Sequence, residues 1–438
     1  MTANTAPISH YGTHVARQQE RWSEALAAEG FDAVAVHAGS QIVSFMDDYH
    51  YPFRPNPHFL AWLPLTHHDE SVLLVRPGER PVVWFYQPDD YWYLPPADPE
   101  PWWAEHFDVQ PVRSTGAWRT GLPPGRVAML GDAPELAGAA NLNPEGLIRR
   151  LHVLRTRKTD YELACMSAAT AVAAKAHQAA RSAFLEGCSE FEIHQRYLAA
   201  ASCSDAELPY PNIVALNRHG AVLHYQARDR ERPAQSRSFL IDAGATVFAY
   251  CSDITRAHAA QDGEFGALIA AMDRLQRELC AGMRAGVDYR EMHLAAHRGI
   301  AAVLADAGVI RVRPETALES GLSSVFFPHG LGHFVGLQTH DVAGLIDDQG
   351  QALPRPEGHP YLRLTRVLEP GNVVTVEPGL YFIDSLLEQW RAHGDRDAVD
   401  WDRVASLRPF GGIRIEDNVV VTRDEPVNLT RAAFSELE

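Results

Sequence analysis

Four carboxylates and one histidine in the second half of the chain are the residues most able to carry chemistry. One imidazole and eight carboxylate oxygens suit hard or borderline divalent ions such as Mn²⁺ better than copper or a lone Zn²⁺. Four negative charges also balance two divalent cations. The set therefore predicts a two-metal hydrolytic centre, and its members, in the segments I-D-A-G, S-D-I-T-R, G-L-G-H, T-V-E-P-G and I-R-I-E-D-N, are Asp242, Asp253, His333, Glu377 and Glu416.

The two aspartates are expected to face each other across a hairpin. Apolar runs precede both, S-F-L-I before Asp242 and V-F-A-Y-C-S before Asp253, and the intervening A-G-A-T is compatible with a turn. A hairpin centred near residue 247 would place the two carboxylates opposite one another. Facing carboxylates repel at neutral pH unless a cation or a proton lies between them. A mere turn-initiating role is the alternative for Asp242 alone.

The other two carboxylates are also expected at strand positions. Glu377 closes the run V-V-T-V-E before Pro378, where a strand stops and its last side chain faces the end of a sheet. Arg414 and Glu416 are two residues apart in a strand-like segment, so both side chains should point to one face. Such an arginine could neutralise Glu416 or bind a substrate carboxylate in a bidentate manner.

The chain has 21 histidines, and most need another explanation. His329 and His333 are separated by glycines, which indicates a loop and not the helix of a zinc protease. His293 and His297 are four apart on an expected helix, but no glutamate lies between them and no third ligand is evident nearby. We interpret that pair as structural. His224, in V-L-H-Y, alternates with apolar neighbours and on its own is typical of a hydrogen-bonded core histidine.

Composition restricts the class of protein. A length of 438 residues, 46% hydrophobic and 22% charged, indicates a soluble globular chain of two domains. A net charge of −17 argues against nucleic-acid and anionic-membrane partners. Five cysteines without a C-x-x-C pair, and an N-terminus without a signal-peptide pattern, indicate a cytoplasmic protein with reduced thiols. The nucleophile elbow, the Walker A loop and the dinucleotide fingerprint are absent from the sequence.

The patterning predicts an α+β fold with a smaller α/β domain first. Residues 1–157 carry an amphipathic helix at 14–28 and strands at 33–36, 71–75, 81–86 and 127–130, with an aromatic and acidic loop between the first two strands. Residues 158–438 form the second domain. Thr159-x-x-Glu162 and Ser189-x-x-Glu192 are capping boxes that begin helices, and longer helices are expected at 264–285 and 289–307. The remaining segments are expected to be strands and turns.

The five motifs, in this order and spacing, resemble the "pita-bread" metallopeptidases, a family that includes methionine aminopeptidase, aminopeptidase P and prolidase. The resemblance is strongest to bacterial prolidases (Xaa-Pro dipeptidases), a group that includes organophosphorus acid anhydrolase. It extends over nearly the whole chain through segments such as H-Y-P-F-R-P-N-P-H-F, P-Y-P-N-I-V-A-L-N and G-H-P-Y-L-R. The implied activity is hydrolysis of dipeptides with C-terminal proline, with organophosphorus triesters as a secondary substrate.

The resemblance also implies a role for each site residue. Asp242 would bind one metal, Asp253 and Glu416 would bridge two, and His333 and Glu377 would complete the second. A bridging hydroxide would attack the scissile carbonyl, while His340 stabilises the oxyanion and Glu377 transfers the proton to the prolyl nitrogen. The implied substrate-binding residues are His224, His340, Arg414, Arg363 and Tyr210, together with Asp48, whose loop would reach the site from the neighbouring subunit of a homodimer.

Two alternatives remain at the level of sequence. Aminopeptidase P takes the first residue from longer Xaa-Pro peptides, and metal-free binding proteins use the same fold. The intact set of five ligands favours an enzyme that holds two divalent metal ions, Mn²⁺ in the first place and Co²⁺ or Zn²⁺ otherwise.

Overall fold

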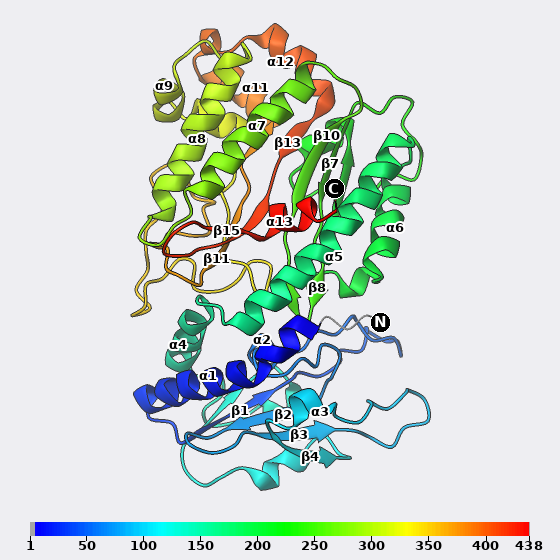
Figure 1. The fold of residues 1–438 in the computed structure, drawn as a ribbon, viewed down its shortest axis with the longest axis vertical. Helices are drawn as coiled ribbons and strands as arrows, with labels where there is room; N and C mark the ends of the chain where they lie inside the picture. The colour runs from blue at the N-terminus through cyan, green and yellow to red at the C-terminus, as the bar shows by residue number, and fades with distance from the viewer. Residues whose placement is uncertain (1–4, 438) are drawn as a thin grey trace. The chain divides into compact units, whose positions relative to one another are not determined.

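The computed structural model describes residues 5–437, which divide into two compact units (Figure 1). Unit 1 comprises the chain up to Cys165 with the short segments Phe248–Tyr250 and Asp348–Gly350, and unit 2 comprises the rest. The sequence-based boundary at 157/158 lies in the connection between α4 (Glu145–Arg155) and α5 (Asp160–Leu185).

Unit 1 is built on a mixed five-stranded sheet of order β4-β3-β2-β1-β5. Its β1 pairs in antiparallel fashion with β2 and in parallel with β5, and every residue of β1 and β2 is buried. Helix α1 (Thr5–Glu29) packs on α4 and ends at Gly30, whose φ of 68° is the left-handed conformation typical of a helix terminus. The strands are β1 (Ala33–His37), β2 (Val72–Val75), β3 (Val82–Tyr86), β4 (Asp108–Val112) and β5 (Val127–Leu130), and the short helices are α2 (Pro57–Leu60) and α3 (Pro101–Ala104).

The four strands expected in unit 1 are confirmed, and β4 was missed. The missed strand lies at the edge of the sheet, contains Pro111 and is largely exposed, so its sequence lacks the apolar alternation that identifies a strand.

Unit 2 combines small antiparallel sheets with long helices, which confirms the α+β expectation. One sheet has the order β10-β7-β6, a second β11-β14-β15, and β12 pairs with β13. Bridges between Thr255 and Glu416 and between Phe334 and Val374 join segments far apart in the sequence. The strands are β6 (Ile213–Leu216), β7 (Ser238–Asp242), β8 (Thr246–Val247), β9 (Tyr250–Cys251, of which Tyr250 is assigned to unit 1), β10 (Thr255–Ala259), β11 (Val373–Val376), β12 (Gly379–Tyr381), β13 (Gly412–Arg414), β14 (Asp417–Val420) and β15 (Val427–Asn428).

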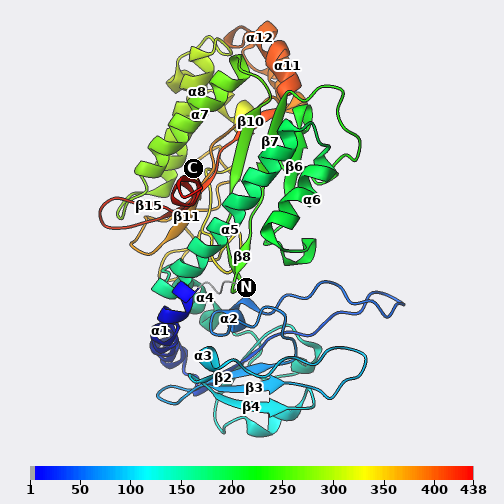
Figure 2. The ribbon, with the colours of Figure 1, turned by 45° about the vertical axis from the view of Figure 1, so that its right-hand side comes forward.

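The long helices of unit 2 flank these strands. Figures 1 and 2 show α7 (Glu264–Ala281) and α8 (Tyr289–Asp306) side by side on one side of β7 and β10, with α5 and α6 (Glu190–Ala201) on the other. Both expected capping boxes are present, since Thr159 N–H donates to Glu162 and Ser189 N–H to Glu192. The sequence did not indicate the short helices α9 (Pro314–Glu319), α10 (Leu322–Phe326), α11 (Asp384–His393), α12 (Trp401–Leu407) and α13 (Leu429–Ser435).

The hairpin that carries the two aspartates has a different register from the expected one. Asp242 pairs with Thr255, so the turn is centred between Phe248 and Ala249, both of which have positive φ. A centre near residue 247 was therefore wrong, and Asp253 lies two residues away from the position opposite Asp242. An even offset keeps both side chains on the same face of the hairpin.

No disulfide joins any of the five cysteines, all of which lie within residues 5–437. Among residues 5–437, the structure contains no helix with the length and apolar character needed to cross a bilayer.

Candidate metal centre

Three of the five expected ligands converge in the interior of unit 2. Asp253, His333 and Glu416 each offer a ligand atom, and these atoms all lie within 4.8 Å of one another in a buried position. They come from three separate segments: the turn before β10, the loop before β11, and the junction of β13 with β14. The side chains of Asp253 and His333 are 6% and 4% exposed, so the contact between this carboxylate and the imidazole is shielded from water.

Glu377 lies next to this group. Its Oε1 is 3.6 Å from His333 Nε2, and the Oδ2 of Asp253 is 3.5 Å from the same nitrogen. Glu377 follows β11 directly, as expected, and its backbone N–H donates to Leu331 O. On its other side, Glu377 Oε2 lies 3.7 Å from Nδ1 of His329.

Asp242 completes the set at the end of β7. Its Oδ2 accepts a hydrogen bond of 2.7 Å from Arg414 Nη2. Its Oδ1 is buried and has no hydrogen-bond partner among residues 5–437. A buried carboxylate oxygen without a donor is costly unless a cation binds it, so this atom is suited to a metal.

Arg414 is paired with Asp242 and not with Glu416. Its Nη1 donates to Tyr381 Oη at 2.8 Å and its Nε to Thr255 Oγ1 at 3.2 Å. The buried guanidinium of Arg414 is thus hydrogen-bonded to three side chains. This arrangement orients the carboxylate of Asp242.

Burial and mutual repulsion raise the pKa values of the acids. Burial raises the pKa of Asp253 well above its usual range, and the charge of Asp242 raises it further. Burial also raises the pKa of Glu416, with the charge of Asp253 as the next cause. The pKa of Glu377 is raised to about 8, again mainly by burial. Such a cluster holds protons near neutral pH unless cations replace them.

The histidines of the site are neutral. Burial lowers the pKa of His333 to about 3 and that of His340 to about 4. His333 Nδ1 shares a hydrogen bond of 2.9 Å with Phe334 O, which leaves Nε2 directed at the acids. A neutral imidazole with one nitrogen fixed in this way is the ligating form.

The other expected substrate residues lie at different distances from the centre. The ring centroid of His340 is 4.4 Å from that of His333. Burial raises the pKa of the Tyr210 hydroxyl, and the charges of the nearby Asp242 and Asp253 raise it further. The exposed residues Arg363 and His224 both lower the pKa of His340 electrostatically. Asp48 lies in an exposed loop of unit 1.

Several residues that hold the site together were missed at the sequence level. Thr255 Oγ1 donates to Glu416 Oε2 at 2.6 Å, and the side chain of Asn418 is hydrogen-bonded to the backbone of Asp253. The signal was alternation, because Thr255 follows Asp253, and Asn418 follows Glu416, by two residues in each motif. Tyr381 and Thr375, which bind Arg414 and the backbone of His333, carry no local signal.

Comparisons with known proteins agree with this geometry. The model of metallopeptidase family M24 matches residues 164–423, and a model described as the N-terminal domain of Xaa-Pro dipeptidase matches residues 9–153. An Xaa-Pro dipeptidase of Stenotrophomonas maltophilia (strain R551-3) is 49% identical over 434 residues, 98% of each chain. One of Xanthomonas campestris pv. campestris (strain 8004) is 50% identical over 430 residues, covering 97% of this chain and 98% of the relative.

Solved structures show the same fold. Aminopeptidase P II from Yersinia pestis superposes with a TM-score of 0.69 at 23% identity, covering 95% of this chain and 96% of the other. A variant of Escherichia coli aminopeptidase P in complex with substrate gives a TM-score of 0.71 at 22% identity, covering 96% and 95%. At this identity the similarity shows the fold alone.

The fold and the converging acids define a pita-bread metallohydrolase. The chain belongs to metallopeptidase family M24 and, within it, to the Xaa-Pro dipeptidases. The resemblance found in the sequence is thereby confirmed.

Proposed function

We propose that this protein hydrolyses dipeptides whose second residue is proline, and that unit 2 contains the whole catalytic centre. The observation that carries the proposal is the buried convergence of Asp253, His333 and Glu416 within 4.8 Å, in a chain about half identical to Xaa-Pro dipeptidases over almost its full length. The family makes the protein a metal-dependent hydrolase. The substrate named for those relatives is the one we propose here.

The donor set fits two divalent cations. Asp242, Asp253, His333, Glu377 and Glu416 would hold them. The orphaned Oδ1 of Asp242 and the raised pKa values of Asp253 and Glu416 are the features a cation would relieve. Mn²⁺ is our first choice because oxygen donors dominate, with Co²⁺ or Zn²⁺ as substitutes.

Ions held there would supply polarisation of the scissile carbonyl and a water molecule of lowered pKa. The residues of the chain then supply proton transfer and positioning. Glu377, with a pKa of about 8 set mainly by burial, is suited to accept a proton and pass it to the prolyl nitrogen. His340 is neutral and can donate a hydrogen bond to the developing oxyanion.

The chemistry of the substrate suits this type of centre. An Xaa-Pro bond has no amide hydrogen, so a peptidase that orients the scissile N–H loses a contact. Activation of the carbonyl does not need that hydrogen. His224 and Tyr210 would line the prolyl pocket.

We assign different roles to Arg414 and Arg363. Arg414 is occupied by Asp242, Thr255 and Tyr381, so we assign it to orienting Asp242. Arg363 is exposed, and among residues 5–437 its guanidinium has no hydrogen-bond partner. We therefore assign recognition of the free prolyl carboxylate to Arg363. A site that recognises this carboxylate favours dipeptides over longer chains.

Homodimerisation is part of the proposal. The loop that carries Asp48 exposes Phe45 and Met46 by 87% and 90%, and a second loop of unit 1 exposes Trp92 and Leu94 by 77% and 96%. Exposed apolar side chains of this kind mark interaction surfaces. We propose that the first loop contacts a second copy of the chain, where Asp48 would close the site. A cytoplasmic location and a weaker phosphotriesterase activity stay predictions.

Proline release from Ala-Pro and Leu-Pro, compared with Ala-Pro-Ala, tests the function. Enzyme treated with a chelator should regain dipeptide hydrolysis with Mn²⁺ and show little activity on the tripeptide. Asp253→Asn should abolish activity, whereas Asp262→Asn, on the surface, should not. Equal turnover of the tripeptide would instead indicate an aminopeptidase P. Absence of metal-dependent turnover on any of these peptides would refute the proposal.

A further inference from the structure

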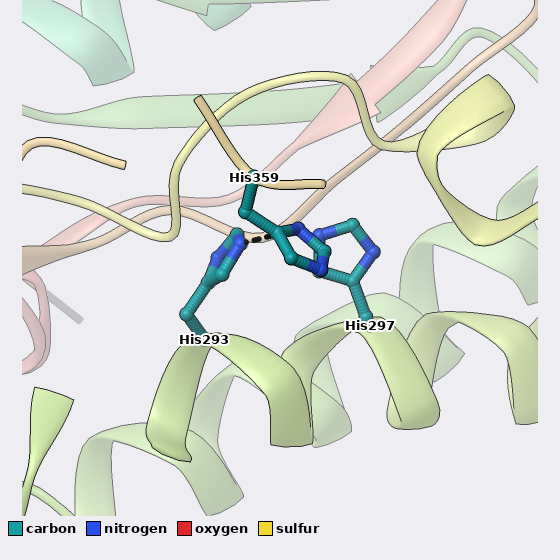
Figure 3. A group of neighbouring side chains, drawn as sticks. All are labelled: His293, His297 and His359. Atoms are coloured by element: carbon teal, nitrogen blue, oxygen red, sulfur yellow. Dashed lines mark hydrogen bonds between the residues drawn. The ribbon is translucent and has the colours of Figure 1, made fainter. Parts of the chain in front are cut away.

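Three histidines gather in unit 2 apart from the four acids and one imidazole described above. His293 and His297 lie on α8, and His359 belongs to the segment 354–366 (Figure 3). Each offers a ring nitrogen, and these nitrogens lie within 4.8 Å of one another. The sequence-based statement that no third ligand lies near His293 and His297 was therefore wrong, because His359 is 66 residues away from His293 along the chain.

The ring nitrogens are spaced for a transition metal. His293 Nε2 and His359 Nδ1 are 3.0 Å apart. Zinc–nitrogen bonds of about 2.0–2.1 Å in a tetrahedral site place two ligand nitrogens roughly 3.3 Å apart. Figure 3 shows the rings of His293 and His297 directed from one face of α8 toward the ring of His359. Small ring rotations would bring the three donors around one ion.

The surroundings prepare the imidazoles for ligation. His297 Nδ1 shares a hydrogen bond of 3.0 Å with Ser323 Oγ, which orients the ring. Both His293 and His297 are 1% exposed, and His297 Nε2, the ring nitrogen that does not bond Ser323, has no hydrogen-bond partner among residues 5–437. Burial lowers the pKa of His293 to about 3, so its ring is neutral at pH 7. Unsatisfied, neutral and buried nitrogens are costly without a ligand.

A second cluster of potential metal ligands in unit 2 differs from the three histidines, because its polar atoms already have protein partners. Glu190, His219 and Asp229 also lie within ligating distance of one another. The carboxylate of Glu190, however, accepts hydrogen bonds from His219, from Tyr225 Oη and from the backbone N–H groups of Leu216 and Asp229. That cluster is satisfied by protein donors and needs no ion.

We propose that His293, His297 and His359 form a separate site for one late first-row divalent cation, Zn²⁺, Co²⁺, Ni²⁺ or Cu²⁺. Three imidazoles without a carboxylate favour these ions over Mn²⁺ or Mg²⁺. The half-buried His359 leaves the fourth position accessible to water or to a small anion, which would offset part of the ion's charge. The proposal does not rest on the proposed peptidase function.

Such an ion would fasten the segment 354–366 to α8. The segment already contacts the start of this helix, since Tyr289 N–H donates to Arg366 O. A bond to His359 would add a second point of attachment, four residues before Arg363. Metal binding should therefore slow amide hydrogen exchange in residues 355–363.

Metal stoichiometry measured on matched variants tests the site. Protein stripped with a chelator and dialysed against excess Zn²⁺ should hold one more ion per chain than His359→Ala or His293→Gln treated in the same way. His393→Ala removes an exposed histidine at the end of α11 and should keep that ion. Asp253→Asn should also keep it, which separates this site from the acidic centre.

Spectra and hydrogen exchange provide independent readouts. In the Asp253→Asn background, Co²⁺ should give the intense visible bands of a tetrahedral nitrogen-rich site, and His359→Ala should remove them. Zinc should slow exchange of 355–363 in the wild type and not in His359→Ala. Equal stoichiometry and equal Co²⁺ spectra in the wild type and in folded His359→Ala and His293→Gln would overturn the proposal.

Discussion

Asp253 and Asn418 exchange two hydrogen bonds although 165 residues separate them. Asn418 Nδ2 donates to the carbonyl oxygen of Asp253 at 2.6 Å, and the Asp253 N–H donates to Asn418 Oδ1 at 2.9 Å. The backbone N–H of Asn418 in turn donates to Thr430 Oγ1. Asn418 is fully buried. A side-chain amide on β14 thus fixes the backbone from which Asp253, a proposed metal ligand, projects.

Replacing this amide should weaken metal binding and the fold together. Asn418→Ala leaves a buried N–H and a buried C=O of Asp253 without partners, which should cost about 2–4 kcal/mol of unfolding free energy. Loss of a group that orients a ligand should lower metal affinity about 10–100-fold. Urea unfolding and competition with a chelating dye measure the two effects.

The matched control is Asn141→Ala. The side chain of Asn141 donates to Val127 O in unit 1, so its loss removes a comparable amide–backbone bond away from the centre. Metal affinity should stay unchanged in this variant. Unaltered metal affinity in folded Asn418→Ala would show that Asp253 is positioned without Asn418.

Recognition of the prolyl carboxylate should depend on Arg363. Loss of a hydrogen-bonded charge pair of about 1.5–3 kcal/mol corresponds to roughly a 10–150-fold rise in KM for Ala-Pro. Arg363→Met should therefore raise KM with a smaller change in kcat. Steady-state kinetics with Ala-Pro and with Ala-Pro-amide separate the effects, since the amide lacks the carboxylate and should respond little to the substitution.

Arg313→Met, an exposed arginine before α9, is the control for loss of surface charge. If Arg363→Met changed the kinetics of the dipeptide and of its amide equally, recognition of the carboxylate would have to be assigned elsewhere.

The features that were predicted correctly are those whose signals lie close together in the sequence. Strands β1, β2, β3 and β5 and the two capping boxes were predicted because their signals lie within four to eight consecutive residues. The residue types of the proposed ligands were evident from short motifs for the same reason. Edge strand β4, with Pro111, has a weak local signal and was missed.

Relationships between distant segments could not be predicted. The sequence placed Arg414 on one face with Glu416, two residues away, but it carried no signal for the hydrogen bond of Arg414 to Asp242, 172 residues away. The third histidine of the cluster on α8 was overlooked because His359 lies in an irregular segment. Pairing of this kind is determined by the register of several sheets, and a one-residue change of register moves a side chain to the other face.

Metal loading should release protons at neutral pH. In the metal-free protein, burial raises the pKa of Glu377 to about 8 and those of Asp253 and Glu416 well above their usual ranges. At pH 7 these carboxyls carry protons that a divalent cation must displace, so metal affinity should increase as the pH rises toward 8. We expect release of about one proton or more per chain at pH 7.

Calorimetric titration with Mn²⁺ in two buffers of different ionisation enthalpy measures this release. Glu377→Gln removes one of the titrating groups and should release fewer protons than the wild type. A binding enthalpy that is identical in the two buffers would contradict the expected protonation of the metal-free site.

Asp417, the neighbour of Glu416, should stabilise the fold through two arginines. Its Oδ1 accepts a hydrogen bond of 2.8 Å from Arg256, and its Oδ2 one of 2.7 Å from Arg431. Burial alone would raise the pKa of Asp417, but the charges of Arg256 and Arg431 outweigh burial and lower this pKa to about 2. Asp417→Asn leaves the buried Arg256 without its carboxylate partner and Arg431 with Asp273 alone, and it should cost about 3–5 kcal/mol at pH 7.

The pH dependence of that loss has a definite sign. A carboxyl whose pKa is lower in the folded protein contributes its full stabilisation above the unfolded pKa of about 4 and loses it as the pH falls toward 2. The difference in unfolding free energy between wild type and Asp417→Asn should thus be constant from pH 7 to 5 and shrink below about pH 4. Urea unfolding across this range measures the difference.

The control is Glu425→Gln, which removes an exposed partner of Arg284 and should change stability by less than about 0.5 kcal/mol at every pH. A difference for Asp417→Asn as small as that of Glu425→Gln would show that the buried pair does not stabilise the junction of β13 and β14.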